Sequence, residues 1–210
     1  LYASQVPSEL TAYFEKNRQS LVPEMLALWE ANGNKTRGTW EEVFGRGIGT
    51  EEIFTAWHFA RFTEGLTKAG KAEYPLPMFV NAALVRPGHS PGQYPSGGPL
   101  PHLFDVWKAG APSIDFLSPD IYFQNFAEWT RKYDRQGNPF FIPEAGMFPL
   151  VSVNMLYAVG EHDAIGVSPF AIESAQEPVA GQMAAAYDLL RQLEPLILAN
   201  QGTGRIAGLL

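Results

Sequence analysis

PFFIPEAG, residues 139–146, is the stretch that decides the fold of this chain. Its apolar centre, residues 140–142, follows turn-forming residues at 134–138, and this pattern predicts a buried strand. Glu144 is placed where that strand should end, and Gly146 lets the backbone turn sharply. A carboxylate at the end of a buried strand is costly unless it is paired or used. Glu144 therefore either pairs with a nearby Arg or Lys or belongs to a functional site.

Three similar apolar runs occur elsewhere in the chain, and helical patterns separate all four. The predicted strands are residues 78–85, 114–118, 140–142 and 164–170, and their near-continuous apolar character is typical of strands buried on both faces. Helices are predicted to open at Ser8 and to cover about 21–30, 50–69, 102–110, 123–133 and 151–159, with a last one from Val179 that Pro195 ends or kinks. Alternating strands and helices predict a parallel sheet.

Two of these helices carry enough apolar side chains for their burial to be predicted. The helix at 50–69 has one apolar stripe that includes Trp57 and a second formed by Phe59, Phe62 and Leu66. A helix that is apolar on two sides is expected to be largely buried. In the last helix Met183, Tyr187, Leu190 and Leu193 are expected to face inward.

Both a doubly wound sheet and a (β/α)8 barrel (a TIM barrel) fit this alternation, and the strand ends favour the barrel. Polar side chains occur at or near the carboxyl end of every predicted strand: Asn81, Tyr122, Glu144 and the stretch 168–173. Barrel active sites are built from those ends. A full barrel needs about 250 residues and eight strands. We therefore expect an α/β chain that supplies the second half of a barrel, strands five to eight, with the rest upstream.

This expectation divides the chain into three parts. Residues 1–50 are predicted to form a loop and short helices over the barrel mouth. Residues 51–200 are predicted to form the half-barrel, and residues 201–210 to start a following segment or domain. Because the chain begins with Leu1 and not Met, it is expected to be cut from something longer. Periplasmic or secreted and cytoplasmic locations both remain open, and a homo-oligomer is compatible with the sequence.

Composition excludes several classes of function. The 210 residues carry a net charge of -7, which argues against a nucleic-acid partner and against an anionic membrane surface. No apolar stretch reaches the roughly eighteen residues that a membrane-spanning helix needs. The chain has no cysteine, so disulfides and thiolate metal sites are excluded. Its 14 Phe, 8 Tyr and 5 Trp supply rings for a core and for stacking on sugar faces.

Sequence motifs for a serine hydrolase, a metal site or a nucleotide site are either incomplete or missing. Residues 88–92 match G-x-S-x-G, but Pro91 follows the serine and has no N–H for an oxyanion hole. The 4 histidines lack metal-ligand spacing, so no metal is expected. No Walker loop or G-x-G-x-x-G follows a strand, so no nucleotide cofactor is expected either.

Carboxylates and aromatic rings remain, and these are the groups that glycoside hydrolysis uses. A retaining enzyme needs two carboxyl groups about 5–5.5 Å apart, one as nucleophile and one as general acid/base. Glu144 suits the nucleophile because a buried strand fixes it. Tyr122 is expected at the end of the preceding strand, where its phenol could donate a hydrogen bond that aims the carboxylate. The alternative for Tyr122 is a tyrosine at the edge of the core.

Two quoted runs carry a family resemblance. Residues 108–122, KAGAPSIDFLSPDIY, followed by FIPE at 141–144, resemble bacterial β-galactosidases of the family-35 and family-42 type, which are clan-A (β/α)8 glycoside hydrolases. AWHFAR at 56–61 and KAEYPLP at 71–77 are similar to the fourth helix and the entry to the fifth strand of those enzymes. The resemblance covers most of residues 50–175.

The resemblance implies a role for several residues. Glu144 matches the clan's nucleophile at the end of strand seven, and Tyr122 matches its tyrosine at the end of strand six. The acid/base glutamate of the clan usually follows an asparagine at the end of strand four. No Asn-Glu pair occurs in this sequence, so that residue is expected upstream of Leu1. Phe170 stands where the clan commonly has a tryptophan under the sugar.

Three further residues are candidates for substrate binding. Glu173 either binds sugar hydroxyls or pairs with a surface base. Asn81 is expected near the end of strand five, within reach of substrate. Trp40 is expected in the loop over the mouth, where it either walls the site or pins the loop.

The sequence thus predicts a retaining, exo-acting β-galactosidase that takes β-galactoside oligo- or polysaccharides and needs no cofactor. A β-glycosidase for another sugar is one alternative. A carbohydrate-binding barrel without catalysis is a second, and would lack the upstream carboxylate. An aldolase or a metal-dependent isomerase is a third, but none of the predicted strands contains the lysine that a Schiff-base aldolase requires.

Overall fold

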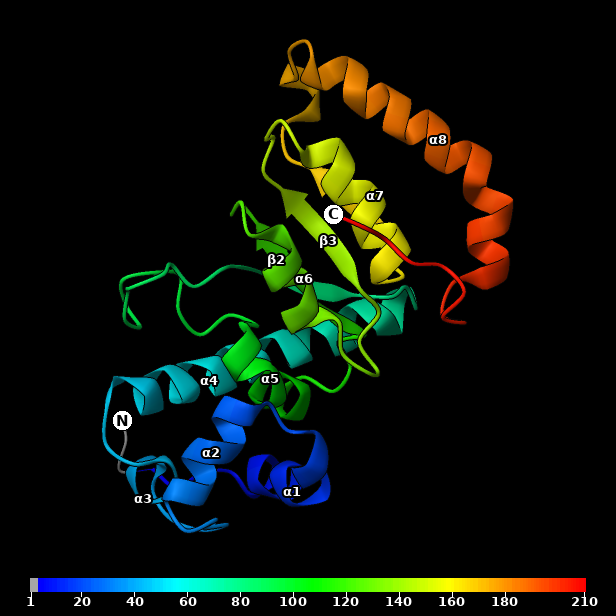
Figure 1. Ribbon diagram of the computed structural model, residues 1–210. Coiled ribbons are helices and arrows are strands. Elements are labelled where there is room, and N and C mark those ends of the chain that lie inside the picture. The colour runs from blue at the N-terminus through cyan, green and yellow to red at the C-terminus, as the bar shows by residue number, and fades with distance from the viewer. Residues whose placement is uncertain (1–3) are drawn as a thin grey trace. The chain divides into compact units, whose positions relative to one another are not determined.

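The computed structural model describes residues 4–210, a mixed α/β chain (Figure 1). Its α-helices are α1 Ser8–Lys16, α2 Pro23–Ala31, α3 Trp40–Phe44, α4 Ile48–Glu73, α5 Phe104–Gly110, α6 Phe126–Tyr133, α7 Val151–Glu161 and α8 Val179–Asn200. Its strands are β1 Phe79–Ala83, β2 Phe116–Ile121, β3 Phe141–Ala145 and β4 Gly166–Pro169, and short 3-10 helices cover Arg18–Ser20, Pro101–Leu103 and Ile172–Ser174. No helix in the described range combines the length and the apolar character needed to cross a membrane.

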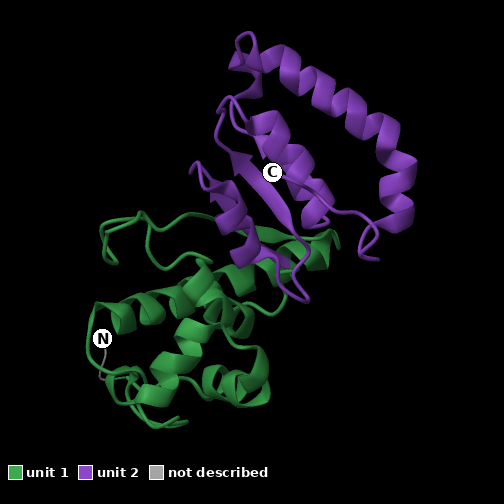
Figure 2. Ribbon diagram, viewed as in Figure 1, with its two compact units in different colours: residues 1–115 green, residues 116–210 purple. Residues whose placement is uncertain are grey.

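The predicted alternation of strands and helices is confirmed, with small shifts in the bounds. The chain divides into two compact units, residues 1–115 and 116–210 (Figure 2). The boundary expected at residue 50 falls within the first unit, where α4 has already begun. The stretch 88–92, which matches G-x-S-x-G, contains turns and irregular backbone, and no helix directly follows it.

The first unit has an aromatic core among its short helices. The Phe14 ring lies 5.6 Å from the Trp29 ring and 6.0 Å from the Phe44 ring, both edge to face. Trp40 packs 6.0 Å from Phe44 and is only 1% exposed. The prediction that Trp40 lies in a loop is wrong, because Thr39 starts a helix there: its side chain accepts from the Glu42 N–H while the Glu42 carboxylate accepts from the Thr39 N–H.

The long helix α4 buries one of its two apolar stripes. Ile53, Ala56, Trp57 and Ala60 are buried, and α4 packs on α5 so closely that a Cβ added at Gly110 would lie 2.7 Å from the Ala60 Cβ. The second stripe was predicted to be buried as well, and this is wrong. The members of this outer α4 stripe are half or more exposed: Phe59 50%, Phe62 69% and Leu66 57%.

Strand β1 also departs from its prediction. Only Ala82 of its residues is buried, and Phe79 is 40% exposed. An open groove of about 460 Å³ lies beside the strand. Phe59 and Phe62 of α4, Val80 and Asn81 of β1 and the Trp107 ring of α5 contribute to its lining.

Two buried carboxylates of α4 hold later segments in place. Glu52 accepts hydrogen bonds from the Tyr94 hydroxyl at 3.1 Å and the Gly97 N–H at 3.4 Å, and its Oε2 lies 2.7 Å from His102 Nε2. Burial and the negative charge of Glu52 both raise the pKa of Tyr94, so the phenol remains a donor. Glu52 thus attaches the segment around residues 94–102 to α4.

Glu64, further along α4, attaches the segment at Ser113 to the helix. Its carboxylate accepts the Ser113 N–H and hydroxyl, both at 2.9 Å, and pairs with Lys68 at 3.0 Å, while its side chain is 2% exposed. Burial alone would raise the pKa of Glu64, but the donors from Ser113 and Lys68 outweigh burial and hold the pKa below its usual value.

The second unit is a parallel sheet in the order β2, β3, β4. Asp120 and Ile121 of β2 pair with Glu144 and Ala145 of β3. Helix α6 packs on β2, and α7 packs on β4 and on α8. Every residue of β2 is buried, as predicted, whereas only Pro169 of β4 is.

Helix α8 continues through Pro195 to Asn200 and bends in its second half (Figure 1). Met183 is buried as predicted. Tyr187 and Leu190 line a cavity between α8, α7 and β4, which agrees with their predicted inward orientation, although Tyr187 is 39% exposed. Leu193 is 36% exposed and does not line this cavity, so the inward orientation predicted for it is wrong. The final residues 205–210 form no regular element. There the Gly208 N–H donates to the Glu161 carboxylate at 3.1 Å, which fixes the segment beside the end of α7.

Candidate active site

Glu144 and Tyr122 meet at the carboxyl ends of two neighbouring parallel strands. Glu144 is half-buried in the last part of β3, and Tyr122 directly follows β2. The Tyr122 hydroxyl donates a hydrogen bond of 2.9 Å to Glu144 Oε2. A phenol bonded to one carboxylate oxygen restricts the rotation of the carboxylate and leaves the other oxygen available. These two predicted residues are therefore brought together.

Asp120 of β2 adds negative charge close to Tyr122. Asp120 is the register partner of Glu144, so both side chains point to the same face of the sheet. It is 8% exposed, and Ser118, two residues earlier on that face, is fully buried with no hydrogen-bond partner for its Oγ among the described residues. Sequence reasoning gave Asp120 no role. The spacing of Ser118, Asp120 and Tyr122 at every second position of a strand was the available signal.

The state of the Tyr122 hydroxyl follows from these neighbours. Burial, the hydrogen bond to Glu144 and the negative charges of Glu144 and Asp120 all raise the pKa of Tyr122. The phenol is therefore protonated near neutral pH. Tyr122 acts as a constant donor to Glu144.

Phe170 joins this pair from the next strand. Its ring centroid lies 6.3 Å from that of Tyr122, with the planes at 65°, and it is 56% exposed. Its N–H donates to the Ala145 carbonyl at 2.9 Å, which extends the β3–β4 pairing by one bond beyond β4. Phe170 is thus placed beside the site, with an open ring face.

Glu173 is less closely connected. It lies in the 3-10 turn Ile172–Ser174, which follows a left-handed residue, Ala171, at φ 56°. Glu173 is exposed, and no hydrogen bond or ion pair joins it to another residue in the described range. The alternative that it pairs with a surface base finds no partner here.

Asn81 and Trp40 belong to the first unit, and only their local surroundings bear on their predicted roles. Asn81 is exposed and lines the groove beside β1. Trp40 is enclosed by the core, with its ring 5.3 Å from the Phe54 ring as well as against Phe44. A ring that is buried in this way pins the segment, which was the alternative to walling the site.

Thr130, His162 and Asp134 are arranged like a hydrolase triad, but substrate cannot reach the Thr130 hydroxyl. His162 lies with Nε2 3.0 Å from Thr130 Oγ1 and Nδ1 2.7 Å from Asp134 Oδ2. Thr130 is completely buried, and its hydroxyl donates to the Ala127 carbonyl at 3.1 Å. No substrate can reach a hydroxyl placed there, so these residues join the ends of α6 and α7.

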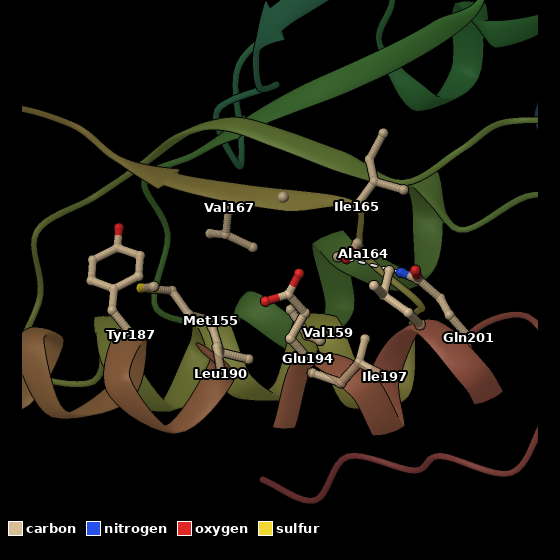
Figure 3. Close-up of a pocket in the computed structure, with 12 residues that line it drawn as sticks. Met155, Val159, Ala164, Ile165, Val167, Tyr187, Leu190, Glu194, Ile197 and Gln201 are labelled. Atoms are coloured by element: carbon tan, nitrogen blue, oxygen red, sulfur yellow. Dashed lines mark hydrogen bonds between the residues drawn. The ribbon is translucent and has the colours of Figure 1, made fainter. Parts of the chain in front are cut away.

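The second unit also contains a cavity of about 490 Å³ between β4, α7 and α8 (Figure 3). Its walls are mostly apolar, with Met155 and Val159 from α7, Val167 from β4 and Ile197 from α8. Figure 3 shows Glu194 as the one charged side chain among the labelled residues. A lone carboxylate in an apolar wall lacks the second group that acid–base or nucleophilic chemistry needs.

Within residues 4–210, no cluster of three or more His, Asp or Glu side chains is arranged to hold a metal ion. No protein-family model matches the chain, and no curated protein matches its sequence. Function is therefore inferred from the residues themselves. Their arrangement provides a carboxylate aimed by a permanent donor, next to exposed aromatic rings, at the carboxyl edge of a parallel sheet.

Proposed function

We propose that the chain carries the nucleophile of a retaining, exo-acting β-glycosidase, with β-galactosides as the substrates that the family resemblance favours. The single observation that carries the proposal is the 2.9 Å hydrogen bond from the Tyr122 hydroxyl to Glu144. It supports a nucleophilic role because the hydrogen bond fixes one carboxylate oxygen and leaves the other for attack. Phe170 offers an exposed ring beside this pair, as sugar binding requires.

The proposed reaction has two displacements. In the first, a carboxylate oxygen of Glu144 attacks the anomeric carbon, and the bond to the leaving oxygen breaks. That oxygen takes a proton from an acid/base carboxyl, which we place on a segment outside this chain. In the second, the same group removes a proton from water, which attacks the anomeric carbon and releases Glu144. Tyr122 holds Glu144 in position throughout.

We extend the proposal to a (β/α)8 barrel in which this chain forms strands five to eight. The parallel order β2, β3, β4 agrees with such a barrel, as does the placing of Tyr122 and Glu144 at strand ends. The exposed outer α4 stripe and the open groove beside β1 also support it, since further strand–helix units would cover apolar surface of this kind.

The proposal is tested with a mechanism-based trap on the complete protein. A 2-deoxy-2-fluoro-β-galactoside with a good leaving group slows the second displacement and leaves the sugar on the nucleophile. We expect peptide mass mapping to find one adduct, on Glu144, and Glu144→Gln to abolish it. Glu128→Gln provides the matched control, since Glu128 is an exposed glutamate of α6 that pairs with Lys132, and it should retain the adduct.

Two results would contradict the proposal. An adduct on another carboxylate, with turnover of aryl β-galactosides, would remove Glu144 from the nucleophile's role. No adduct and no turnover of any aryl glycoside would favour a carbohydrate-binding barrel without catalysis.

A further inference from the structure

The turn that follows Glu144 places an aromatic ring that sequence analysis did not assign to the site. A Cβ added at Gly146 would lie only 2.4 Å from Phe148 Cε2 and 2.9 Å from its Cζ. The Phe148 ring therefore occupies the space that a side chain at position 146 would fill. Any larger residue at position 146 would displace the ring.

The Phe148 ring occupies a position on the same face of β3 as Glu144. Residues two apart in a strand point to the same face, about 6.6 Å apart along the chain. The Gly146 N–H donates to the Ile121 carbonyl at 2.9 Å, so the pairing of β3 with β2 extends by one bond past the end of the strand. A side chain at position 146 would thus project on the face of Glu144, one step nearer the carboxyl edge. The Phe148 ring takes that place.

Backbone hydrogen bonds fix Phe148 there on both sides. Its N–H donates to the Gly146 carbonyl at 2.9 Å, and its own carbonyl accepts from the Val151 N–H at 2.9 Å at the start of α7. The ring is only partly buried, so one part packs on Gly146 and another part faces solvent. A held ring with an open part can bind a ligand at a low cost in conformational entropy.

We propose that Phe148 is a substrate-contacting residue, the apolar platform on which the sugar bound at Glu144 stacks. The inference rests on the proposed function and adds a residue that selects among sugar substrates. A platform of this kind favours pyranosides with a continuous face of C–H groups. Galactosides have such a face, because the axial 4-hydroxyl leaves the hydrogens at carbons 3, 4 and 5 on one side. Phe148 is therefore expected to set the preference for galactosides over glucosides.

The test compares Phe148→Ala with Phe148→Trp in the complete protein. Removing the ring should raise KM for an aryl β-galactoside about tenfold, which corresponds to about 1.4 kcal/mol, and leave kcat within about twofold. The dissociation constant of an uncleaved 1-thio-β-galactoside should rise by the same factor. Phe148→Trp keeps a platform and should keep KM, and the galactoside-to-glucoside ratio of kcat/KM should fall in the alanine variant alone.

Leu150→Ala is the matched control, since Leu150 lies on the same turn and is 61% exposed. It should change none of these values. Gly146→Ala, which pushes the ring away, should reproduce the KM rise if Phe148→Ala does not fold.

Two outcomes would overturn the inference while leaving Glu144 as the nucleophile. One is an unchanged KM and thio-galactoside affinity in Phe148→Ala that still labels at Glu144. The other is a fall in kcat alone, which would mean that the ring supports the Glu144 turn and not the ligand. Loss of the adduct from the wild-type protein would instead refute the proposed function.

Discussion

Replacing Tyr122 with phenylalanine tests how much its hydroxyl contributes to the reactivity of Glu144. The substitution removes one hydrogen bond, the 2.9 Å contact to Glu144 Oε2, and keeps the ring that packs against Phe170. Hydrogen bonds to charged groups contribute about 1.5–3 kcal/mol. Because Tyr122 is 41% exposed, water can replace part of the bond, and the lower end of that range applies. About 1.5–2 kcal/mol corresponds to about a 10- to 30-fold slower reaction.

The assay is the rate of labelling of Glu144 by the fluoro-galactoside trap, followed by intact mass. Trapping isolates the first displacement, in which the aim of the carboxylate matters most. Tyr187→Phe, a comparable change on α8, should leave the rate unchanged. The melting temperature of Tyr122→Phe should stay within a few degrees of the wild type. A labelling rate within twofold of the wild type would refute the role given to the hydroxyl.

Three other outcomes are expected. Glu144→Gly should lower the hydrolysis rate at least about 10⁴-fold, and added azide should then yield an α-glycosyl azide by attack on the opposite face; a β-product would argue against Glu144 as the nucleophile. Because the folded-state pKa of Glu64 is depressed, its contribution to stability is complete above the unfolded-state value and is lost as pH falls through the folded-state value. Glu64→Gln should thus lower the free energy of unfolding by about 1–3 kcal/mol near neutral pH and by less in acid. Urea unfolding at each pH measures this difference, and an equal loss at all pH values would contradict the prediction. Gly110→Ala should lower the free energy of unfolding by about 1–3 kcal/mol, because its Cβ would lie 2.7 Å from the Ala60 Cβ. The control Gly65→Ala, which would meet no atom within 4 Å, should stabilise α4 by about 0.5–1 kcal/mol. Thermal unfolding compares the two variants, and similar melting temperatures would contradict the close contact.

The order of elements could be read from the sequence because each strand is a short apolar run with helical periodicity on both sides. Residues 116–118 of the strand predicted at 114–118 are buried as expected, and so are Phe140 and Ile142 of the strand predicted at 140–142. Burial of the outer α4 stripe could not be read in the same way. Periodicity says which side chains share a face, but not whether another element covers that face.

Some residues of the candidate site could likewise be predicted from the sequence, and others could not. Tyr122 and Glu144 were expected at the ends of adjacent parallel strands, and register then brings them into contact. Asp120 belongs to the same face but lies beyond the strand predicted at 114–118, and the sequence assigned it no role. Phe148 could not be found from spacing, because its position depends on the backbone path through Gly146 and not on a strand or helix period.

The carboxylate of Glu52, with its contacts to Tyr94, Gly97 and His102, has a consequence for how this chain varies among its relatives. Losing Glu52 leaves a phenol and a backbone N–H buried without an acceptor, and losing Tyr94 leaves the carboxylate short of a donor. Each single change is therefore worse than the combined change, so the effects are not additive. In related sequences we expect positions 52, 94 and 102 to covary as a set, with an apolar residue at 52 accompanied by a Tyr94→Phe replacement.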